Sequence, residues 1–368
     1  MLRSLDHGWW GLVQVAGKGG KKSGQHVTLR DVAAAAGVGK ATVDRVINDR
    51  GNVSDEVRNR VLQIARDLGL RRILPSGHRR NIRINVVLGR PDRPLIVRLA
   101  EEFRRRSARL DAGITVHRTI LRSEDPGPLA TAMLQGAFDA VIICAPDDPQ
   151  IHAATAILAE RAIPVVTVIS DVPRSARLAY AGTDHYKAGR SAGFFLGRMT
   201  SGRAPGKVIV LCYHTGLQAQ SERIRGLKDH LAVKVPHLTL AEIVMGGDDP
   251  ILSEVKLVDA FRRHPETICV YNVGAGNRGV VAAIQRDILS QRPIFVGHEL
   301  TNFTWHALRE GLMTLAIDQS PTHQADYAIE VLLNHFGFDG ATHAVPPYVS
   351  DAPIVLYGPE NLPDSPPA

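Results

Sequence analysis

Short apolar runs alternate with longer amphipathic segments through most of this chain. The apolar runs lie at residues 84–88, 140–144, 165–169, 208–212, 268–271, 294–296 and 312–317. The amphipathic segments lie at 94–112, 148–162, 186–200, 221–231, 252–264 and 277–290. Strands that alternate with helices at this spacing indicate βαβ units, whose parallel sheets are covered by helices on both faces. The pattern therefore predicts an α/β body over residues 83–357.

Composition excludes several other classes of protein. The 368 residues are 44% hydrophobic and 22% charged, which is typical of a globular protein with two or three domains. The best apolar run, 140–145, is far shorter than the ~18–20 residues of a membrane-spanning helix. The first 27 residues lack the features of an export signal, so we expect a cytoplasmic protein without membrane contact. The cysteines lie in apolar runs, where buried free thiols are expected: Cys144, Cys212 and Cys269.

The excess of basic residues is confined to the first 82 positions. There, 15 Lys and Arg stand against 7 Asp and Glu, whereas the rest of the chain has 29 and 30. A basic module on a near-neutral body indicates that the module binds a polyanion such as nucleic acid. The alternative is a solubilising basic tail, which we prefer for Lys18, Lys21 and Lys22 in the sequence GKGGKKSG.

Three short helices are predicted between residues 27 and 70. Thr28 and Asp31 form a capping-box pattern that starts the first helix, and Gly37 ends it. A second helix is expected over 40–47, and a third begins after the cap Ser54. The apolar positions that should close their core are Val43, Val46, Ile47, Val57, Val61, Ile64, Ala65 and Leu68. Two short helices joined by a Gly-containing turn are a helix-turn-helix arrangement.

The exposed side of the second helix carries the candidate DNA contacts. The N-terminal residues of such a helix can enter a major groove about 12 Å wide. Arginine or lysine pairs with guanine there, and a small apolar side chain contacts a thymine methyl group, so Lys40, Ala41 and Arg45 are candidate base readers. Short donors near helix ends suit contacts with phosphate, which position the module without reading sequence. These are Thr28, Thr42, Asn48 and Ser54.

The same segment resembles a known DNA-binding headpiece. The run T-L-x-D-V-A-x-x-A-G-V-x-x-x-T-V-x-R-V-x-N, followed by V-S and an R-x-x-V helix, is similar to that of the lactose-repressor (LacI/GalR) family. In that family, the first two residues of the recognition helix and an arginine further along it contact bases. The resemblance therefore implies the same role for Lys40, Ala41 and Arg45.

Two features depart from the family pattern. Asp44 stands where the family usually has serine, and a carboxylate beside phosphates is repelled unless it pairs with Arg45 or accepts from a cytosine amino group. The family's hinge helix, with its leucine wedge for the minor groove, is replaced by RRILPSGHRRNIRI, where Pro75 and Gly77 disfavour a helix. Leu74 remains a candidate wedge. The linker arginines, which can hold phosphates, are Arg71, Arg72, Arg79 and Arg80.

Polar residues follow the predicted strands, at the ends where parallel sheets bind ligands. In chain order they are Arg90, Asp92, Asp147, Asp148, Ser170, Asp171, the stretch 214–223, Asn272, His298, Glu299, Asp318 and Gln319. Carboxylates, amides and an arginine that converge on one cleft provide donors and acceptors for a polyhydroxylated small molecule. Any one of these side chains could instead cap a helix or a turn.

The body also resembles a known family. YAGTDHYKAGRSAGFFLG, VGHELT and AIDQSP are similar to the lobe-joining and ligand-binding segments of periplasmic sugar-binding proteins. This looser resemblance covers residues 83–357 and implies two lobes with parallel, Rossmann-like sheets. The family positions that hold the sugar fall on Asp171, Asn272, Glu299 and Gln319, with Arg223 as a further candidate. The first loop, GRPDRP, lacks the aromatic side chains that usually stack on a sugar ring.

These observations divide the chain into five parts. Residues 1–25 are a flexible extension, 26–70 the helix-turn-helix domain, 71–82 a linker, 83–357 the ligand-binding domain, and 358–368 a tail. Within the ligand-binding domain we expect lobe 1 at about 83–184 and 302–322, and lobe 2 at about 185–301 and 323–357.

Other sites are weakly indicated. Gly274, Gly276 and Gly279 spell G-x-G-x-x-G after a strand, which suggests a dinucleotide site, but this fingerprint belongs in the first βαβ unit of its domain. The pair His298-Glu299 lacks the second histidine of a zinc helix, and no motif frames a nucleophile. We therefore expect no metal, no cofactor and no enzyme.

The sequence predicts a homodimeric transcription regulator. We expect it to bind operator DNA, to repress genes of carbohydrate uptake or catabolism, and to respond to a sugar or sugar derivative bound between its lobes. The alternative is a sugar-binding protein or an NAD-type enzyme with an adventitious basic N-terminal extension.

Overall fold

A computed structural model describes residues 27–48, 50, 53–68, 70, 81–213, 217–337 and 352–367. The chain divides into two compact units, residues 1–79 and 80–368. The predicted extension 1–25 and nearly all of the linker lie outside the described residues, including Leu74, Pro75, Gly77 and the four linker arginines. The expectations about the hinge region therefore stay predictions.

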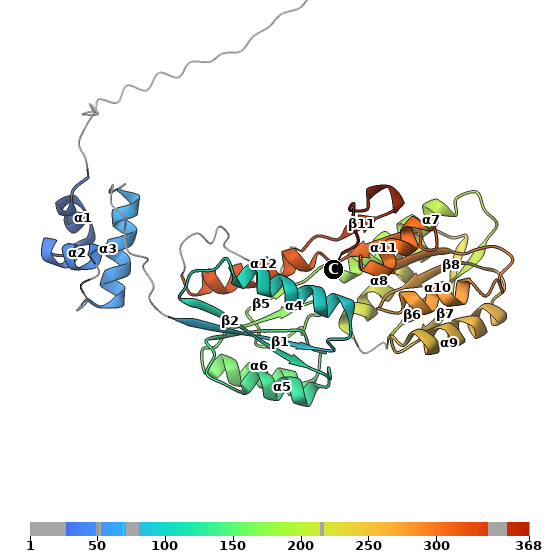
Figure 1. Ribbon diagram of the computed structural model, residues 1–368, viewed down its shortest axis with the longest axis horizontal. Helices are drawn as coiled ribbons and strands as arrows, with labels where there is room; N and C mark the ends of the chain where they lie inside the picture. The colour runs from blue at the N-terminus through green and yellow to red at the C-terminus, as the bar shows by residue number, and fades with distance from the viewer. Residues whose placement is uncertain are drawn as a thin grey trace, which may run out of the picture. The chain divides into compact units, whose positions relative to one another are not determined.

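The first unit contains helices α1 (Leu29–Ala36), α2 (Lys40–Ile47) and α3 (Asp55–Asp67) (Figure 1). The Thr28 amide donates to the Asp31 carboxylate at 2.8 Å, as the capping box requires, and Gly37 ends α1 in the left-handed conformation at φ 64°. The helices enclose one core made of Val32, Ala33, Ala36, Val43, Val46, Ile47, Val61, Leu62 and Ala65. Leu68, expected in this core, is 39% exposed, because α3 ends at Asp67 and Leu68 lies just beyond it, whereas Leu62 within the helix is buried.

Lobe 1 of the second unit contains a parallel sheet with the order β2-β1-β3-β4-β5. Its strands are β1 (Ile82–Gly89), β2 (Ile114–Leu121), β3 (Ala140–Ile143), β4 (Val165–Val168) and β5 (Ala179–Ala181). Its helices are α4 (Pro94–Ser107), α5 (Pro126–Leu134), α6 (Pro149–Glu160) and α12 (Pro321–His335). Helices α4 and α12 cover one face of the sheet, and α5 and α6 cover the other.

Lobe 2 contains a second sheet with the order β11-β10-β9-β8-β6-β7, in which only β11 is antiparallel among the described strands. The strands are β6 (Gly206–Cys212), β7 (Leu238–Met245), β8 (Thr267–Asn272), β9 (Ile294–His298), β10 (Leu315–Asp318) and β11 (Val355–Tyr357). The helices are α7 (His185–Met199), α8 (Gln218–Lys234), α9 (Pro250–Arg263), α10 (Asn277–Ile284) and α11 (Asn302–Arg309). Helices α7 and α8 cover one face, and α9 to α11 cover the other. The predicted two-lobed α/β fold is confirmed.

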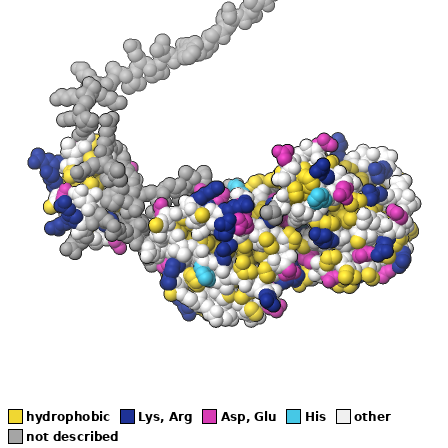
Figure 2. Space-filling view, viewed as in Figure 1, with side chains coloured by type: hydrophobic (Ala, Val, Ile, Leu, Met, Phe, Trp, Pro, Cys, Tyr) yellow, Lys and Arg dark blue, Asp and Glu magenta, His cyan; other side chains and the backbone are white. Residues whose placement is uncertain are grey.

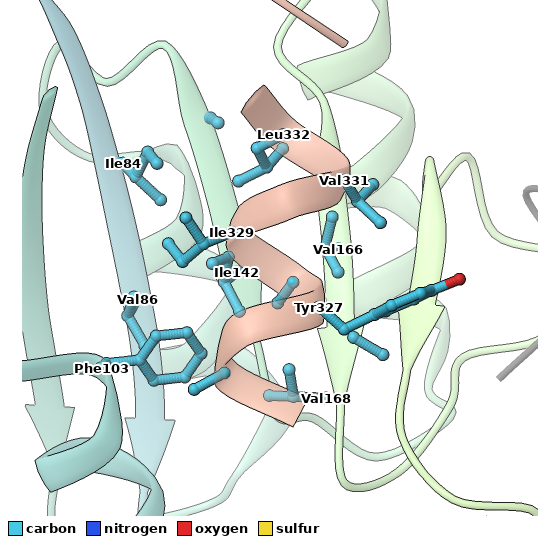
Figure 3. Packing of buried hydrophobic residues seen from close by; sticks show 14 of the residues in the cluster. Ile84, Val86, Phe103, Ile142, Val166, Val168, Tyr327, Ile329, Val331 and Leu332 are labelled. Atoms are coloured by element: carbon cyan, nitrogen blue, oxygen red, sulfur yellow. The ribbon is translucent and has the colours of Figure 1, made fainter. Parts of the chain in front are cut away.

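The predicted assignment of the late segments to the lobes is wrong. Helix α11 and strand β10, expected in lobe 1, belong to lobe 2, because β10 pairs with β9 and Leu315 lies opposite Val296. Helix α12, expected in lobe 2, packs on the lobe 1 sheet. Figure 3 shows Ile329 and Leu332 of this helix among the side chains of that sheet. The chain therefore crosses between lobes after Asp318.

The C-terminal residues pack on lobe 2. The indole of the buried Trp305 donates to the Pro363 carbonyl at 2.9 Å, and Leu362 contacts the same core. The short helix η1 (Pro359–Asn361) lies in this segment, which the sequence suggested was only a tail. No helix of the described residues combines the length and the apolar character that crossing a membrane requires.

Candidate functional sites

Helix α2 separates its buried and exposed residues cleanly. Val43, Val46 and Ile47 are buried in the headpiece core. Lys40, Ala41 and Arg45, the candidate base readers, are exposed, and Thr42 is half-buried. Figure 2 shows Lys and Arg side chains gathered over the α2 side of this unit. The geometry of a recognition helix, with apolar residues inward and basic residues outward, is therefore present.

The candidate phosphate contacts lie at helix ends. Thr28 is exposed at the N-cap of α1, and its hydroxyl donates to the Asp31 carboxylate at 2.8 Å. Thr42 lies in the first turn of α2, and Ser54 is exposed immediately before α3. Asn48 is exposed at the C-terminus of α2. Each of these positions lets a short side chain face solvent beside a helix terminus.

Asp44 binds other partners than the expected Arg45. Its carboxylate accepts from Asn48 Nδ2 at 2.8 Å and from Arg50 Nη1 at 3.3 Å. The amide of Asn48 also donates to the Asp44 carbonyl at 2.9 Å. The negative charge of Asp44 is thus partly balanced within the headpiece, and the side-chain amide of Asn48 donates its hydrogen bonds to this residue.

A cavity of about 560 Å³ lies between the two lobes. It is lined by the loops that follow β1 to β4 in lobe 1 and by those that follow β6 to β10 in lobe 2, together with the first turns of α4, α8 and α10. All of these loops leave the carboxyl ends of parallel strands, where open α/β sheets bind ligands. The volume is in the ordinary range for small-molecule sites.

The cavity contains three of the five residues that the sequence nominated for effector binding. Arg223, Glu299 and Gln319 line it and are all buried. They come from α8, from the end of β9 and from the crossover after β10. These residues are far apart in the sequence, and the two-lobed fold brings them together.

Asp171 and Asn272 lie outside the lining. The Asp171 carboxylate accepts from Arg177 Nη2 at 2.6 Å and from the Thr167 hydroxyl at 2.9 Å, so it orders its own loop. Asn272 is fully buried and donates to Asn277 Oδ1 at 2.7 Å. Asn277, the first residue of α10, lines the cavity in place of Asn272.

Sequence reasoning missed several charged residues of the cavity. Arg98 on α4 donates to Asp318 at 2.6 Å and to Glu299 at 3.2 Å, and so connects lobe 1 with lobe 2. Arg93 binds Glu124 through both nitrogens, lies 3.5 Å from the Asp248 carboxylate, and covers the Tyr213 ring at 4.5 Å. The sequence signals were weak: Arg98 lies on the polar side of the predicted helix 94–112, and Arg93 lies in the loop GRPDRP just before it.

Burial perturbs the carboxyl group at the centre of these contacts. Burial, together with the negative charge of Asp318, raises the pKa of Glu299 to about 7, although Arg98 opposes the change. The Glu299 backbone has φ 71°, and three other lining or neighbouring residues have positive φ: Arg90, Ile169 and Ser320. Such strained positions cluster at ligand sites in many proteins.

Four buried polar atoms of the lining residues have no hydrogen-bond partner among the described residues. They are the Ser170 hydroxyl oxygen, Gln319 Oε1, Arg93 Nε and His298 Nδ1, and Ser170 and Gln319 are only 4% and 2% exposed. Buried polar groups are nearly always satisfied in folded proteins, so several unsatisfied groups around one cavity indicate a bound partner that completes them. Hydroxyl groups can serve all of these atoms, because they donate and accept.

A buried histidine, His185, connects this cavity to the segment in which the chain passes from β5 of lobe 1 to α7 of lobe 2. His185 Nδ1 accepts from Arg223 Nη2 at 3.2 Å, so the ring hydrogen must lie on Nε2, which is 2.6 Å from the Ile169 carbonyl oxygen. Burial and the charge of Arg223 lower the pKa of His185 to about 3, which keeps the ring neutral. The Tyr180 hydroxyl donates to the same carbonyl at 2.8 Å. The lobe 2 arginine is thus joined through one ring to a lobe 1 loop.

The glycines of the G-x-G-x-x-G sequence have packing explanations. A Cβ on Gly279 would lie 2.5 Å from the Ser253 Cβ and 2.7 Å from the Pro250 carbonyl, so α10 and α9 need a glycine to approach each other. A Cβ on Gly276 would lie 2.6 Å from the Leu211 side chain. Close helix and strand packing accounts for this pattern without a dinucleotide.

The second unit has two lobes and a cavity at the ends of its strands, which is the architecture of a ligand-binding domain. The same chain carries a helix-turn-helix unit, which is the architecture of a DNA-binding headpiece. Residues 128–339 match the family described as periplasmic binding protein domain, and residues 28–72 match bacterial regulatory proteins, lacI family. The chain therefore belongs to the periplasmic-binding-protein domain family and carries a lacI-family headpiece. This confirms both resemblances found in the sequence.

Individual relatives agree with this assignment. The sucrose operon repressor of Klebsiella pneumoniae is 45% identical over 64 residues, which are 17% of this chain; the chain spans only 18% of that repressor's length. A solute-binding protein from Burkholderia graminis, solved with D-arabinose, superposes with a TM-score of 0.69 at 18% identity over 77% of this chain and 97% of its own. A glucose-galactose binding protein from Geobacillus stearothermophilus gives 0.68 at 20% identity over 77% and 99%. These structures show the shared fold.

Proposed function

We propose that this protein is a sequence-specific DNA-binding regulator, a repressor of genes for carbohydrate uptake or catabolism, controlled by a sugar or sugar derivative. The observation that carries the proposal is the combination of two sites in one chain. Helix α2 exposes Lys40, Ala41 and Arg45 above a closed core, and the second unit holds a cavity with unsatisfied buried polar atoms. As a regulator of transcription, the protein would work in the cytoplasm.

The headpiece supports contact with duplex DNA by its charge and shape. Lys40 lies at the first position of α2, where a side chain can reach a guanine edge, and Ala41 beside it is small enough to meet a thymine methyl group. Arg45 lies in the last turn on the exposed side. Thr28, Thr42, Asn48 and Ser54 remain proposed phosphate contacts, of which Asn48 must first release Asp44.

The cavity supports the binding of a polyhydroxylated effector. Glu299 and Gln319 from lobe 2 and the crossover, and Ser170 from lobe 1, bring acceptors and an amide to one space. A ligand that contacts both lobes favours one arrangement of them, and its differential affinity sets how far the equilibrium shifts. Arg223, through its hydrogen bond with His185 at the start of α7, is proposed to couple ligand binding to the segment that joins β5 of lobe 1 to α7 of lobe 2.

A homodimer is part of the proposal. Helix-turn-helix proteins of this kind bind two half-sites about 34–36 Å apart, which requires two headpieces. Exposed apolar side chains on β7 and α9 offer a surface for a second copy, with Met245 51%, Ile251 74% and Val255 53% exposed. Val255→Asp is expected to give monomers in analytical ultracentrifugation.

Selection of duplexes from a random pool tests the proposed function. The purified chain should enrich one operator, and that operator should bind about 10³-fold or more tightly than scrambled duplexes. Lys40→Ala should relax the preference at one base position, whereas Lys228→Ala, which removes an exposed lysine of α8, should not. Steep salt dependence without sequence preference would contradict the proposal and favour an adventitious basic extension.

A further inference from the structure

The carboxylates that line the cavity are already bound to arginines of the protein. This holds for every lining carboxylate in the described parts of the chain, and the pairs with their N–O distances are Arg90–Asp92 at 2.8 Å, Arg93–Glu124 at 2.9 Å, Arg93–Asp248 at 3.5 Å and Arg98–Glu299 at 3.2 Å. Asp318, behind the lining, is also bound to Arg98, at 2.6 Å. The negative charges of the site are therefore committed to protein partners.

Two further arginines of the lining have no carboxylate partner among the described residues. Arg223 is 4% exposed; its Nη1 donates to the Val273 carbonyl at 2.7 Å, and its other bonds go to the His185 ring. A guanidinium has five N–H donors, so two of them remain available. Arg278 is exposed in the first turn of α10, and its guanidinium lies 4.4 Å from the centre of the Phe303 ring.

The uncommitted charge of the cavity is therefore positive. The neutral His185 ring cannot balance the buried Arg223, and burial lowers the pKa of that guanidinium, which reflects the cost of the isolated charge. Near Arg278, the N-terminus of α10 adds the partial positive charge of its free amides. A carboxylate or phosphate on the ligand would offset this cost, because arginine binds both through charge-assisted, often bidentate hydrogen bonds.

Hydroxyl groups are required by a different part of the lining. The Ser170 hydroxyl oxygen and Gln319 Oε1 are buried and lack partners among the described residues. A fully deprotonated inorganic anion such as sulfate would leave the Gln319 oxygen without a donor, since such an anion only accepts. The lining thus calls for donors and for negative charge in the same molecule.

We propose that the effector is an acidic sugar derivative, a polyhydroxylated molecule with one carboxylate or phosphate group that binds Arg223 and Arg278. This inference rests on the proposed function and narrows its ligand class. Neutral sugars, which cannot balance the two arginines, are expected to bind more weakly than their acidic counterparts.

Calorimetric titration of the full-length chain with matched ligands tests the inference. The ligands are glucose, galactose and mannose, each as the neutral sugar, the uronate and the 6-phosphate. The best acidic member should bind at least tenfold more tightly than its neutral parent, and its affinity should fall as salt increases, as expected for a charge contact. Uronate and phosphate arms distinguish the two anionic groups.

Two variants locate the contact. Arg278→Gln should lower the preference for the acid over its neutral parent at least threefold, because it removes a positive charge of the lining. Arg286→Gln, which removes an exposed arginine bound to Glu254 just beyond the same helix, should have no effect. Equal effects of the two variants would overturn the assignment of Arg278. If a neutral sugar binds as tightly as its acids, the inference fails but the sugar effector stands; if none of the nine binds, both fail.

Discussion

Glu299 is expected to make the protein less stable as the pH rises. Burial holds its pKa at about 7 in the folded protein, against an ordinary value of 4.5. Below pH 4.5 both folded and unfolded chains are protonated at this residue. Between 4.5 and 7 the unfolded chain loses the proton while the folded chain keeps it, so stability falls and the loss is complete above pH 7. At about 1.4 kcal/mol for each pKa unit, the raised value corresponds to about 3 kcal/mol.

Glu299→Gln removes this dependence, because an amide keeps the shape of the side chain but does not titrate. We would measure the free energy of unfolding by urea titration, followed by circular dichroism, from pH 4.5 to 8. As the pH rises across this range, the free energy of unfolding of the variant should increase by about 3 kcal/mol relative to that of the wild type. Glu310→Gln, at an exposed carboxylate after α11, should run parallel to the wild type. Parallel curves for Glu299→Gln and the wild type would refute the reasoning.

Three further predictions concern packing and charge. Gly189→Ala should cost about 1–3 kcal/mol in urea unfolding and weaken ligand binding, because its Cβ would lie 2.0 Å from the Arg223 carbonyl oxygen; Ser191→Ala on the same helix should do neither. Asp44→Asn should strengthen operator binding about fivefold in fluorescence anisotropy, because it removes a negative charge beside phosphates; weaker binding would show that the carboxylate contacts a base. Leu62→Ala should destabilise the headpiece by about 2–5 kcal/mol, measured by hydrogen exchange of α1 to α3; unchanged protection would contradict its place in the core.

The sequence predicted the central strands well and the edges poorly. Buried parallel strands such as β3 and β8 are nearly continuous apolar runs, which are easily recognised in the sequence. The edge strands β2 and β7 face solvent on part of their surface, so their apolar residues are interrupted and the pattern fades. The exchange of late segments between lobes depends on which sheet edge is free, and no local sequence signal encodes that choice.

The candidate site was predictable where strand ends alone place a residue. Glu299 and Gln319 follow β9 and β10 directly, so the topology brings them to the cavity. Asp171, which the sequence nominated, does not line the cavity. Ile169 takes a left-handed conformation at φ 63°, so the lining contains Ser170 while the Asp171 carboxylate binds Arg177. Arg98 was missed because its partner Asp318 is 220 positions away, and a polar residue on a helix resembles any solvated one.

The proposed function requires that DNA binding by the headpiece and ligand binding by the second unit be coupled. It is tested most directly by measuring the affinity for the selected operator without ligand and at saturation with the tightest-binding sugar, and the affinity for that sugar with and without operator. Both affinities are expected to change by one common factor, about 5–150-fold, because the coupling of two sites is reciprocal. A factor of one in both titrations would show that the two sites act independently and would contradict the proposed function.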